Sequence, residues 1–553
     1  MTTEKPRVEI LDPEGLKADP SLLTVVLYEE DHTIGNSLKH ILCMMDDVEF
    51  AGYNVPHPLE DKILLRLQTK EGVAAAPIFL KAFDHLETLF ADIRHKFEKA
   101  HSKASVMSNA IISLHVGQCG NQIGHTFWKT LVEEHGLNVD GTAKDENSHS
   151  IVDGKHVFFN QADDDHYVPR SILVDLEPRV INGILSSEYS RLFSKENVFL
   201  SETGGGAGNN WASGFMQGNE VFESIIDMVD REAELAPALD GFNFTHSVSG
   251  GTGSGLGSRL LEKLRDRYPK TIIQSYSVFS DQDAPDVVVQ PYNSILTLQR
   301  LMECTNSVVV LDNTALNRVV ADRLGLPQAS FEHVNKLVAR IMSATTATIR
   351  FPSALYTRLQ HLVCMLVPFP PLRFIQTAFS PIADPKREFV SKTTVKDIMR
   401  TIMQPSSMMV STRSSRSGLD KSCLLQAVAM LQGEFDDRDI PAAYEFIHER
   451  RLIKQPPWAM ASPLHIHKAP LSPFIKPTYK VSGMLMANHT NVASLFADTL
   501  AKYEKFRSKR AFLDRFEREE GFSIDLMQEA ADKTKDLLDL YKEINSEAFF
   551  GRV

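Results

Sequence analysis

The chain has 553 residues, of which 59 are Lys or Arg and 71 are Asp or Glu, so its formal charge at pH 7 is −12. This acidic balance argues against direct nucleic-acid binding, because neutralising phosphates requires a cationic surface. Apolar residues make up 43% of the chain, enough for large buried cores. The sequence has no apolar run of membrane-spanning length and no hydrophobic signal core, and its five cysteines form no CxxC pair. We therefore expect a soluble intracellular protein of several domains that does not enter a membrane.

Roughly the first 105 residues are predicted to form a small unit of their own. Apolar patterning predicts strands at Leu22–Leu27, Glu49–Asn54 and Lys62–Thr69. Helical spacing predicts one helix after Thr33 and a second around Pro77. The second helix either packs on its own sheet or is shared with a partner subunit, and the pattern leaves both open. Its apolar stripe consists of Phe79, Ala82, Phe83, Leu86, Leu89, Phe90, Ile93 and Phe97.

Three runs in this unit carry a specific resemblance. They are Leu27–Leu38 (LYEEDHTIGNSL), Val48–Tyr53 (VEFAGY) and the His57-Pro58 pair. Together they resemble the small alpha-like subunit shared by RNA polymerases I and III, over Leu22–Lys103. The resemblance implies a domain that pairs with the larger alpha-like subunit during polymerase assembly and does no chemistry.

Three glycine-bearing motifs follow. Gly117–Gln122 (GQCGNQ) comes after the predicted strand Ile111–Val116, and we expect a helix to begin near Gln122. Gly204–Trp211 (GGGAGNNW) precedes an apolar helix, and Ser249–Gly255 (SGGTGSG) lies between a predicted strand and a helix. A strand, a glycine loop and a helix in succession present backbone N–H groups to a phosphate. No lysine closes these loops, so they are not Walker loops.

Two acidic residues end another apolar strand. Asp175 and Glu177 lie in Ile172–Pro178 (ILVDLEP). Because the glycine loops contain no lysine, a cation must help to neutralise bound phosphates, and this pair is the candidate Mg²⁺ site, with contact through water. The alternative is an ordinary solvated turn.

The motifs GQCGNQ, DLEP, GGGAGNNW and GGTGSG occur in the order and spacing of the tubulin family. The resemblance covers nearly all of Met107–Val553. Five further runs are similar to the gamma-tubulins: Gln161–Arg170, Glu177–Asn182, Val287–Asn293, Val310–Arg318 and Met484–Thr490.

This resemblance implies a guanine-nucleotide pocket for GTP or GDP with Mg²⁺. The implied phosphate and sugar contacts are Gln118, Cys119, Gln122, Asn209, Gly250, Gly251, Thr252, Gly253 and Ser254. Asn313 and Asn335 are implied to read the guanine edge, Phe331 to stack on the base and Asp286 to face the ribose.

Tubulins complete a GTPase site with an acid from the next subunit, and that acid would fall in Ser353–Pro368. This chain has Tyr356-Thr357-Arg358 where gamma-tubulins commonly have Asn-Asn-Asp, and His361 where alpha-tubulin has its glutamate. A carboxylate general base is therefore missing from this segment. We assign no catalytic residue and expect GTP binding with at most weak GTPase activity. A catalytic His361 and a true GTPase are the alternatives.

The predicted fold is α/β. A Rossmann-like GTPase domain of tubulin type with its core helix is expected at 107–350, an α/β intermediate domain at 351–486 and a helical hairpin at 487–553. A small α+β dimerisation domain is expected at 1–106.

The expected function is microtubule nucleation in a gamma-tubulin ring complex at the centrosome. The expected partners are gamma-tubulin complex proteins, alpha/beta-tubulin and laterally neighbouring copies. The alternative is a subunit of RNA polymerases I and III that carries a tubulin extension and binds the larger alpha-like subunit through residues 22–103, in the nucleus. The chain is either a genuine fusion or two adjacent genes read as one.

Overall fold

The chain divides into two compact units, Met1–Met107 and Ser108–Val553. The computed structural model describes residues 7–56, 62–106, 109–144, 154–163, 166–201, 204–281, 287–325, 330–351, 353, 355–382, 394–412, 422–456, 462–477 and 479–546. Among these residues, no helix is both long enough and apolar enough to cross a membrane.

The amino-terminal unit contains an antiparallel sheet in the order β1-β2-β4-β3. The three predicted strands are β2, β3 and β4, and the two predicted helices are α2 and α3. The Asp31 carboxylate caps α2 by accepting the N–H of Thr33 at 2.7 Å. The short elements β1 and α1 were not predicted, because β1 has three exposed residues and no buried alternation. The bounds are β1 Val8–Ile10, α1 Pro13–Ala18, β2 Leu22–Tyr28, α2 His32–Cys43, β3 Val48–Asn54, β4 Lys62–Thr69 and α3 Ala75–Val106.

The apolar stripe of α3 divides into a buried part and an exposed part. Phe79, Ala82 and Leu86 are buried in the core of this unit, together with side chains of β2 and β4. Further along the helix the stripe is open: 46% of Leu89, 50% of Phe90 and 52% of Ile93 is exposed. The unit's own sheet therefore covers only the first part of the stripe. The side chain of Phe97 lies outside the described residues.

The second unit is built on a ten-stranded sheet in the order β15-β14-β16-β13-β12-β11-β10-β5-β8-β9. The strands from β13 to β9 are parallel to one another. Strand β16 runs antiparallel to both of its neighbours, β13 and β14, and β15 pairs with β14 in parallel. The bounds are β5 Asn109–Val116, β8 Ser171–Asp175, β9 Val198–Leu200, β10 Ala238–Ser247, β11 Ile272–Phe279, β12 Ser307–Asp312, β13 Phe374–Ser380, β14 Leu424–Gly433, β15 Leu464–Lys468 and β16 Val481–His489. A separate hairpin consists of β6 Phe159–Gln161 and β7 Tyr167–Pro169.

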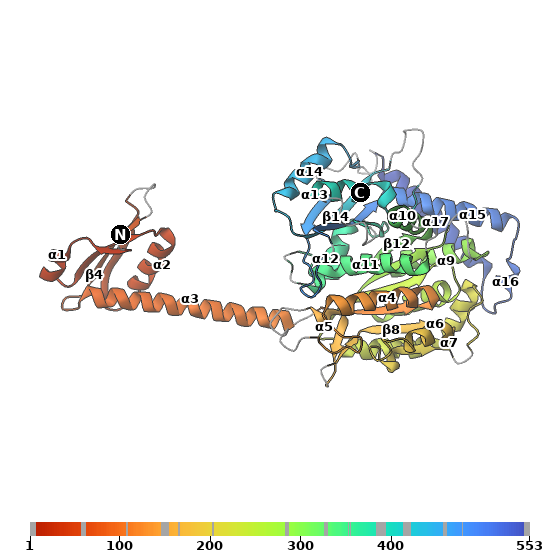
Figure 1. Cartoon of the computed structure of the whole chain (residues 1–553), viewed down its shortest axis with the longest axis horizontal. Helices are drawn as coiled ribbons and strands as arrows, with labels where there is room; N and C mark the ends of the chain where they lie inside the picture. The colour runs from red at the N-terminus through yellow and green to blue at the C-terminus, as the bar shows by residue number, and fades with distance from the viewer. Residues whose placement is uncertain are drawn as a thin grey trace. The chain divides into compact units, whose positions relative to one another are not determined.

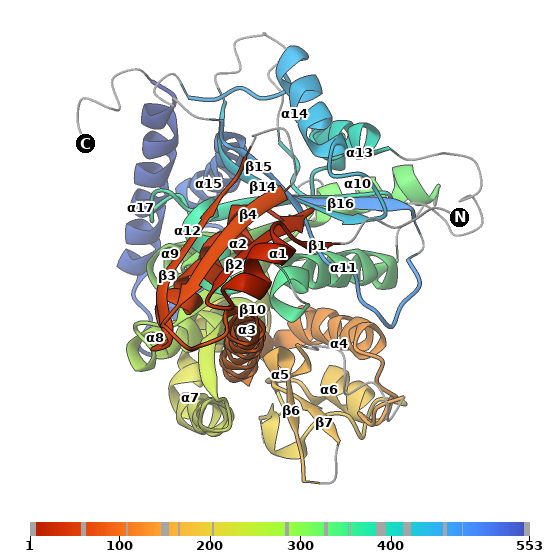
Figure 2. The ribbon, with the colours of Figure 1, turned by 90° about the vertical axis from the view of Figure 1, so that its left-hand side faces the viewer.

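Helices cover both faces of this sheet. Ile111 and Ile112 are neighbours on β5, and they point into two different apolar cores because strand side chains alternate. Figure 2 shows α4 and α11 on one side of the strands and α8, α9 and α17 on the other. The helices covering the sheet are α4 Gly117–Glu134, α5 Lys155–Phe158, α6 Pro178–Leu185, α7 Trp211–Glu234, α8 Gly257–Arg267, α9 Gln290–Cys304, α10 Asn313–Leu324, α11 Phe331–Arg350 and α12 Leu359–Leu366.

The remaining helices form two satellite groups. Helices α13 Val395–Ile402 and α14 Asp439–Glu449 pack on β14 and β16 around a core of their own. Helices α15 Ala493–Ser508, α16 Asp514–Glu517 and α17 Ile524–Ile544 pack on α9. Figure 1 shows this second group beside α9. The fold class predicted from the sequence is thus confirmed: a mixed α/β body with a large parallel sheet follows a small α+β domain.

Candidate nucleotide-binding site

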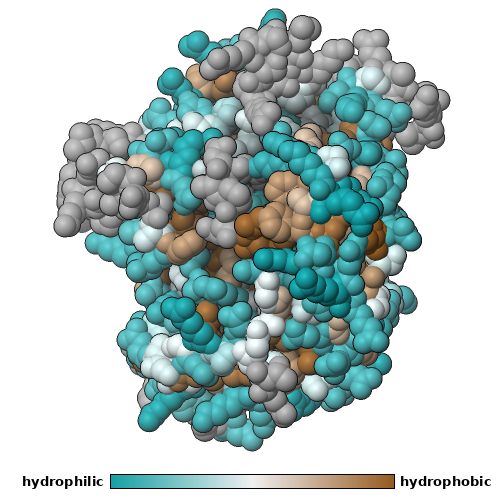
Figure 3. Space-filling model, turned by 90° about the vertical axis from the view of Figure 1, so that its right-hand side faces the viewer, coloured by the Kyte–Doolittle hydropathy of each residue, from teal (hydrophilic) through white to brown (hydrophobic). Residues whose placement is uncertain are grey.

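A cavity of about 300 Å³ lies where the parallel strands end. Because parallel strands bring their carboxyl ends to one edge of a sheet, the segments that follow β5, β8, β10 and β12 meet there. Figure 3 looks onto the right-hand side of Figure 1, toward which these strands run, and shows apolar side chains gathered near the centre of that face. The apolar wall of the cavity comes from Val116, Ile123, Val180, Val278, Val287, Leu316, Val334 and Val338.

The glycine loop after β10 forms part of the cavity floor. Gly250, Gly251, Thr252 and Gly253 line it, and the chain continues through a π-helical turn, Thr252–Leu256, into α8. At Gly251 the loop has no room for a side chain, because a Cβ atom there would lie 2.7 Å from the Cβ of Ala207. Ser254 does not line the cavity. Its buried hydroxyl donates to the carbonyl oxygen of Gly250.

Two buried side chains that the sequence did not single out hold this loop. Nδ2 of Asn293 donates to the carbonyl oxygens of Asn209 and Ser249, both at 2.8 Å, and so ties the second glycine loop to the third. Nδ1 of His246 donates to the carbonyl oxygen of Gly253 at 2.8 Å. Burial lowers the pKa of His246 to about 4, so the ring is neutral at pH 7.

The first glycine motif is the first turn of α4 rather than a loop. The expectation of a helix beginning near Gln122 is wrong: α4 begins at Gly117, which has a φ of +75°. A Cβ on Gly117 would lie 2.9 Å from the backbone nitrogen of Gly253, and one on Gly120 would lie 2.3 Å from the carbonyl oxygen of Thr245. Because Gly117 and Gly120 have no side chain, the helix can begin at Gly117, close to β10 and the neighbouring loop.

Three side chains of this turn, Gln118, Cys119 and Gln122, line the cavity as the resemblance implied. Burial raises the pKa of the Cys119 thiol to about 12. Cys119 therefore faces the cavity as a neutral thiol, and its contact with a phosphate would be that of a weak S–H donor.

The second glycine motif leads into α7. Asn209 lines the cavity with a φ of 56°, and the side chain of Asn210 caps α7 by accepting the N–H of Ala212 at 3.0 Å. Trp211 is buried, and its Nε1 donates to Ser258 Oγ at 3.1 Å. A Cβ on Gly206 would lie 2.4 Å from Oε1 of Glu177, so this motif packs directly on the acidic segment after β8.

That acidic segment also lines the cavity. Asp175 is 2% exposed, and its Oδ1 accepts the N–H of Glu177 at 3.2 Å. The described residues give Oδ2 of Asp175 no hydrogen-bond partner. Burial raises the pKa of Asp175 to about 6. A buried carboxylate oxygen without a partner, beside a second carboxylate, fits a hard cation such as Mg²⁺.

The opposite end of the cavity consists of amide and aromatic side chains. Asn313 begins α10, while Phe331 and Asn335 lie in the first turns of α11. Within the described residues, neither amide side chain has a hydrogen-bond partner, and 70% of Phe331 is exposed. Asp286, the implied ribose contact, lies outside the described residues.

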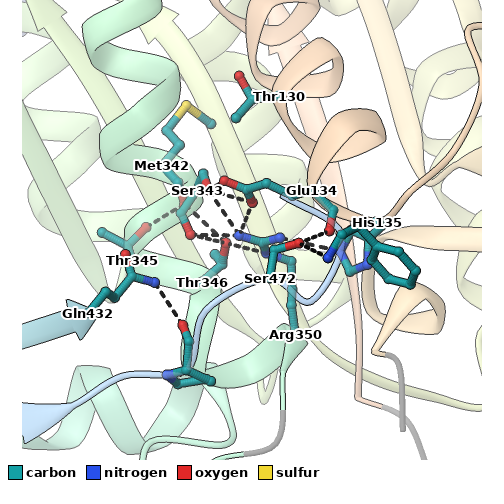
Figure 4. Close-up of polar contacts among 12 residues, drawn as sticks. Thr130, Glu134, His135, Met342, Ser343, Thr345, Thr346, Arg350, Gln432 and Ser472 are labelled. Carbon is teal, nitrogen blue, oxygen red and sulfur yellow. Dashed lines mark hydrogen bonds and ion pairs between the residues drawn. The ribbon is translucent and has the colours of Figure 1, made fainter. Parts of the chain in front are cut away.

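The other end of α11 is held firmly. Arg350 is 1% exposed, and its Nη2 lies 2.7 Å from Oε2 of Glu134 on α4 (Figure 4). Its guanidinium also donates to the carbonyl oxygen of Ser343 at 2.9 Å and to Thr346 Oγ1 at 3.1 Å. Ser343 Oγ donates to the same carboxylate of Glu134. This network fixes the helix that carries Phe331 and Asn335.

One cation of the cavity was not among the expected site residues. Arg179, the second residue of α6, lines it beside Glu177. The sequence offered a signal for it, since Arg179 lies in the gamma-tubulin-like run Glu177–Asn182.

The segment 353–368, in which the tubulin resemblance placed the missing acid, lies near the amino end of β10. Nε of Arg358 donates to Oδ1 of buried Asp240 at 2.9 Å, and Oδ2 of Asp240 accepts the N–H of Leu359. Tyr356 packs edge-on against the ring of His467. Residues 353–368 contain no carboxylate, so this segment presents no acid.

Taken together, the parallel sheet and the cavity at its carboxyl edge define an α/β protein of the nucleotide-binding class. Comparison with known families gives the same class in more detail: residues 110–321 match the Tubulin/FtsZ family GTPase domain, and residues 370–501 match the tubulin C-terminal domain. The chain is 51% identical to a tubulin gamma chain of Caenorhabditis elegans over 447 residues, which are 80% of this chain and 99% of that protein. The chain belongs to the tubulin family.

The amino-terminal unit of the chain matches a different family. Residues 22–96 match the RNA polymerase Rpb3/Rpb11 dimerisation domain. Both resemblances found in the sequence are thus confirmed, and the chain joins a dimerisation domain to a tubulin with a GTPase domain.

Proposed function

We propose that this chain binds guanine nucleotide and nucleates microtubules. In this proposal it acts in a ring of like subunits, held laterally by gamma-tubulin complex proteins at a microtubule-organising centre, and presents a template to alpha/beta-tubulin. The observation that carries the proposal is the 51% identity to a tubulin gamma chain over 99% of that protein's length. The cavity at the carboxyl edge of the sheet is the site proposed for GTP or GDP.

Different residues of the cavity are proposed to contact different parts of the nucleotide. The guanine edge is read by Asn313 and Asn335, whose amides offer both donors and acceptors, and Phe331 stacks on the base. The loop Gly250–Gly253 and the first turn of α4 donate backbone N–H groups to the phosphates. Asp175 and Glu177 hold Mg²⁺, which supplies positive charge against the phosphates. Ser254 is proposed to position the loop, because its hydroxyl donates to the carbonyl oxygen of Gly250.

Turnover of GTP is proposed to be weak. A neighbouring subunit that docked through residues 353–368 would bring no carboxylate to act as a general base. Arg358 stands where gamma-tubulins commonly have an aspartate, and it is engaged with buried Asp240 of its own chain. Single-turnover GTP hydrolysis that is fast without a partner would overturn this part of the proposal.

Nucleation is tested with the purified full-length chain, purified gamma-tubulin complex proteins and alpha/beta-tubulin held below its spontaneous assembly concentration. The expected result is a shorter lag in the rise of turbidity and more microtubules per field when the chain is present with GTP. An unchanged lag with a correctly assembled complex contradicts the proposal.

A second function is favoured by one observation in the amino-terminal unit. Leu89, Phe90 and Ile93 expose apolar surface on α3, within the part that matches a polymerase dimerisation domain. An exposed apolar stripe of this kind fits a partner helix. We propose that this stripe binds the larger alpha-like subunit of RNA polymerases I and III.

Co-purification of the full chain with that subunit tests the pairing. Phe90→Glu is expected to abolish recovery, and Met44→Glu, an equally charged change at an exposed apolar residue of the C-cap of α2, is the matched control. Recovery of the full chain with the polymerase subunit alone, and never with gamma-tubulin complex proteins, would make polymerase assembly the main function and overturn nucleation.

A further inference from the structure

We propose that Arg179 binds the terminal phosphate of a bound guanosine triphosphate and makes the site favour the triphosphate over the diphosphate. This inference rests on the proposed binding of guanine nucleotide. It assigns a phosphate contact to a side chain that neither the glycine motifs nor the acidic pair includes.

The charges around the cavity give the first reason. Among the described residues that line it, Arg179 is the one Lys or Arg, and Asp175 and Glu177 are the acids. Cys119 adds no charge, because burial keeps its thiol neutral. The described side chains that line the cavity therefore carry more negative than positive charge, which opposes a polyphosphate. Beyond the partial charges of backbone N–H groups, Mg²⁺ on the acids and the guanidinium of Arg179 are the full positive charges that the described lining residues can offer.

The order of the strands gives the second reason. Along the carboxyl edge the segments follow in the order β12, β11, β10, β5 and β8. Asn313 follows β12, the loop Gly250–Gly253 follows β10, and Arg179 follows β8. A nucleotide whose base meets Asn313 and whose phosphates cross the glycine loop therefore ends toward α6. The far end of a triphosphate lies nearest the segment that carries Arg179.

The freedom of the Arg179 side chain gives the third reason. The side chain is exposed, and the described residues give it no hydrogen bond or ion pair. Two less exposed arginines of this unit are engaged by contrast: Arg300 pairs with Glu262 at 2.8 Å, and Arg350 pairs with Glu134. The backbone under Arg179 is nevertheless fixed, because Pro178 begins α6 and Glu177 packs on Gly206. A guanidinium without a partner on a fixed backbone is available to bind a ligand.

A guanidinium suits the terminal phosphate in particular. Its planar N–H groups can bond two phosphate oxygens at once, and such charge-assisted bonds are stronger than neutral ones. A diphosphate lacks the last phosphate and is shorter, so it gains little from Arg179. Affinity for GTP should depend on this residue, whereas affinity for GDP should not.

The test measures equilibrium binding of GTP and of GDP to the purified full-length chain in Mg²⁺, by competition with a fluorescent guanine nucleotide. Arg179→Gln is expected to weaken GTP binding by roughly tenfold or more and GDP binding by less than about twofold. Arg179→Lys keeps the positive charge but lacks the planar pair of N–H donors, so its GTP affinity should lie between those of Arg179→Gln and wild type. Arg400→Gln is the matched control. It removes an exposed arginine from α13, which packs on β16 and does not line the cavity, and should leave both affinities unchanged.

The possible outcomes distinguish a failure of this inference from a failure of the proposed nucleotide binding. A wild-type chain that binds both nucleotides, with an Arg179→Gln variant that binds both as well as wild type, overturns the role of Arg179 alone. Equal weakening of GTP and GDP also overturns it, because the contact would then be to a shared part of the nucleotide. A wild-type chain that binds neither nucleotide overturns the proposed function itself.

Discussion

The two ends of α11 show how the same helix can be built for binding at one end and for stability at the other. At its amino end, Phe331 is 70% exposed and the amide of Asn335 has no hydrogen-bond partner among the described residues. At its carboxyl end, Arg350 is 1% exposed, pairs with Glu134 and donates to Ser343 and Thr346. Unsatisfied polar groups beside a cavity indicate a site for a ligand, whereas a fully engaged buried charge indicates structure. Mutations at the two ends should therefore separate affinity from stability.

The largest effect is expected at the carboxyl end. Arg350→Ala leaves the carboxylate of Glu134 without its cation and should lower the free energy of unfolding by about 3 kcal/mol. Urea denaturation of the full chain measures this change. Lys336→Ala breaks an exposed ion pair with Glu332 on the same helix and should cost less than about 0.5 kcal/mol. Equal costs for the two variants would contradict the contrast between buried and exposed pairs.

A smaller effect is expected from His246, which holds the glycine loop through the Gly253 carbonyl oxygen. Burial lowers its pKa from 6.5 to about 4, so the folded state resists protonation. Its contribution to stability is fully present above pH 6.5 and is lost as the pH falls through 6.5 toward about 4.

Unfolding free energies of wild type and His246→Gln, measured from pH 7.5 to pH 4, test this prediction. Wild type should lose on the order of 1 to 3 kcal/mol more than the variant over that range. Parallel pH profiles would mean that His246 titrates alike in the folded and unfolded chains.

The smallest effect on stability is expected at the exposed end of α11. Phe331→Ala removes a largely exposed ring, so the free energy of unfolding should change by less than about 0.5 kcal/mol. GTP binding should weaken by about 1 kcal/mol, because the base loses its stacking partner. Isothermal titration gives the affinity and urea denaturation the stability. A large loss of stability with full GTP affinity would show that Phe331 is a packing residue.

Much of this site could be predicted from the sequence because glycine loops between strands and helices are local signals. The loop around Gly251 and the acidic pair after β8 follow from motif and strand patterning alone. The start of α4 could not be predicted, since it depends on how closely Gly120 approaches Thr245 on another strand. Asn293 and His246 hold the glycine loops through contacts that only the tertiary fold creates.

In the amino-terminal unit, too, part of the structure could not be predicted from local sequence. The apolar stripe of α3 is plain in the sequence, but the place where its burial ends, between Leu86 and Leu89, depends on the size of the sheet beneath it. Likewise, nothing local marks Arg350 as buried, because its partner Glu134 lies on α4.

The most direct test of the guanine site is the affinity of the full-length chain for GTP, measured for wild type and for Asn335→Ala together with the melting temperature of each. Loss of the amide should weaken GTP binding by roughly tenfold, because a buried hydrogen-bond pair to the base is lost, and leave thermal stability nearly unchanged. A clear drop in melting temperature with undiminished GTP affinity would contradict the account, since Asn335 would then serve the fold rather than the nucleotide.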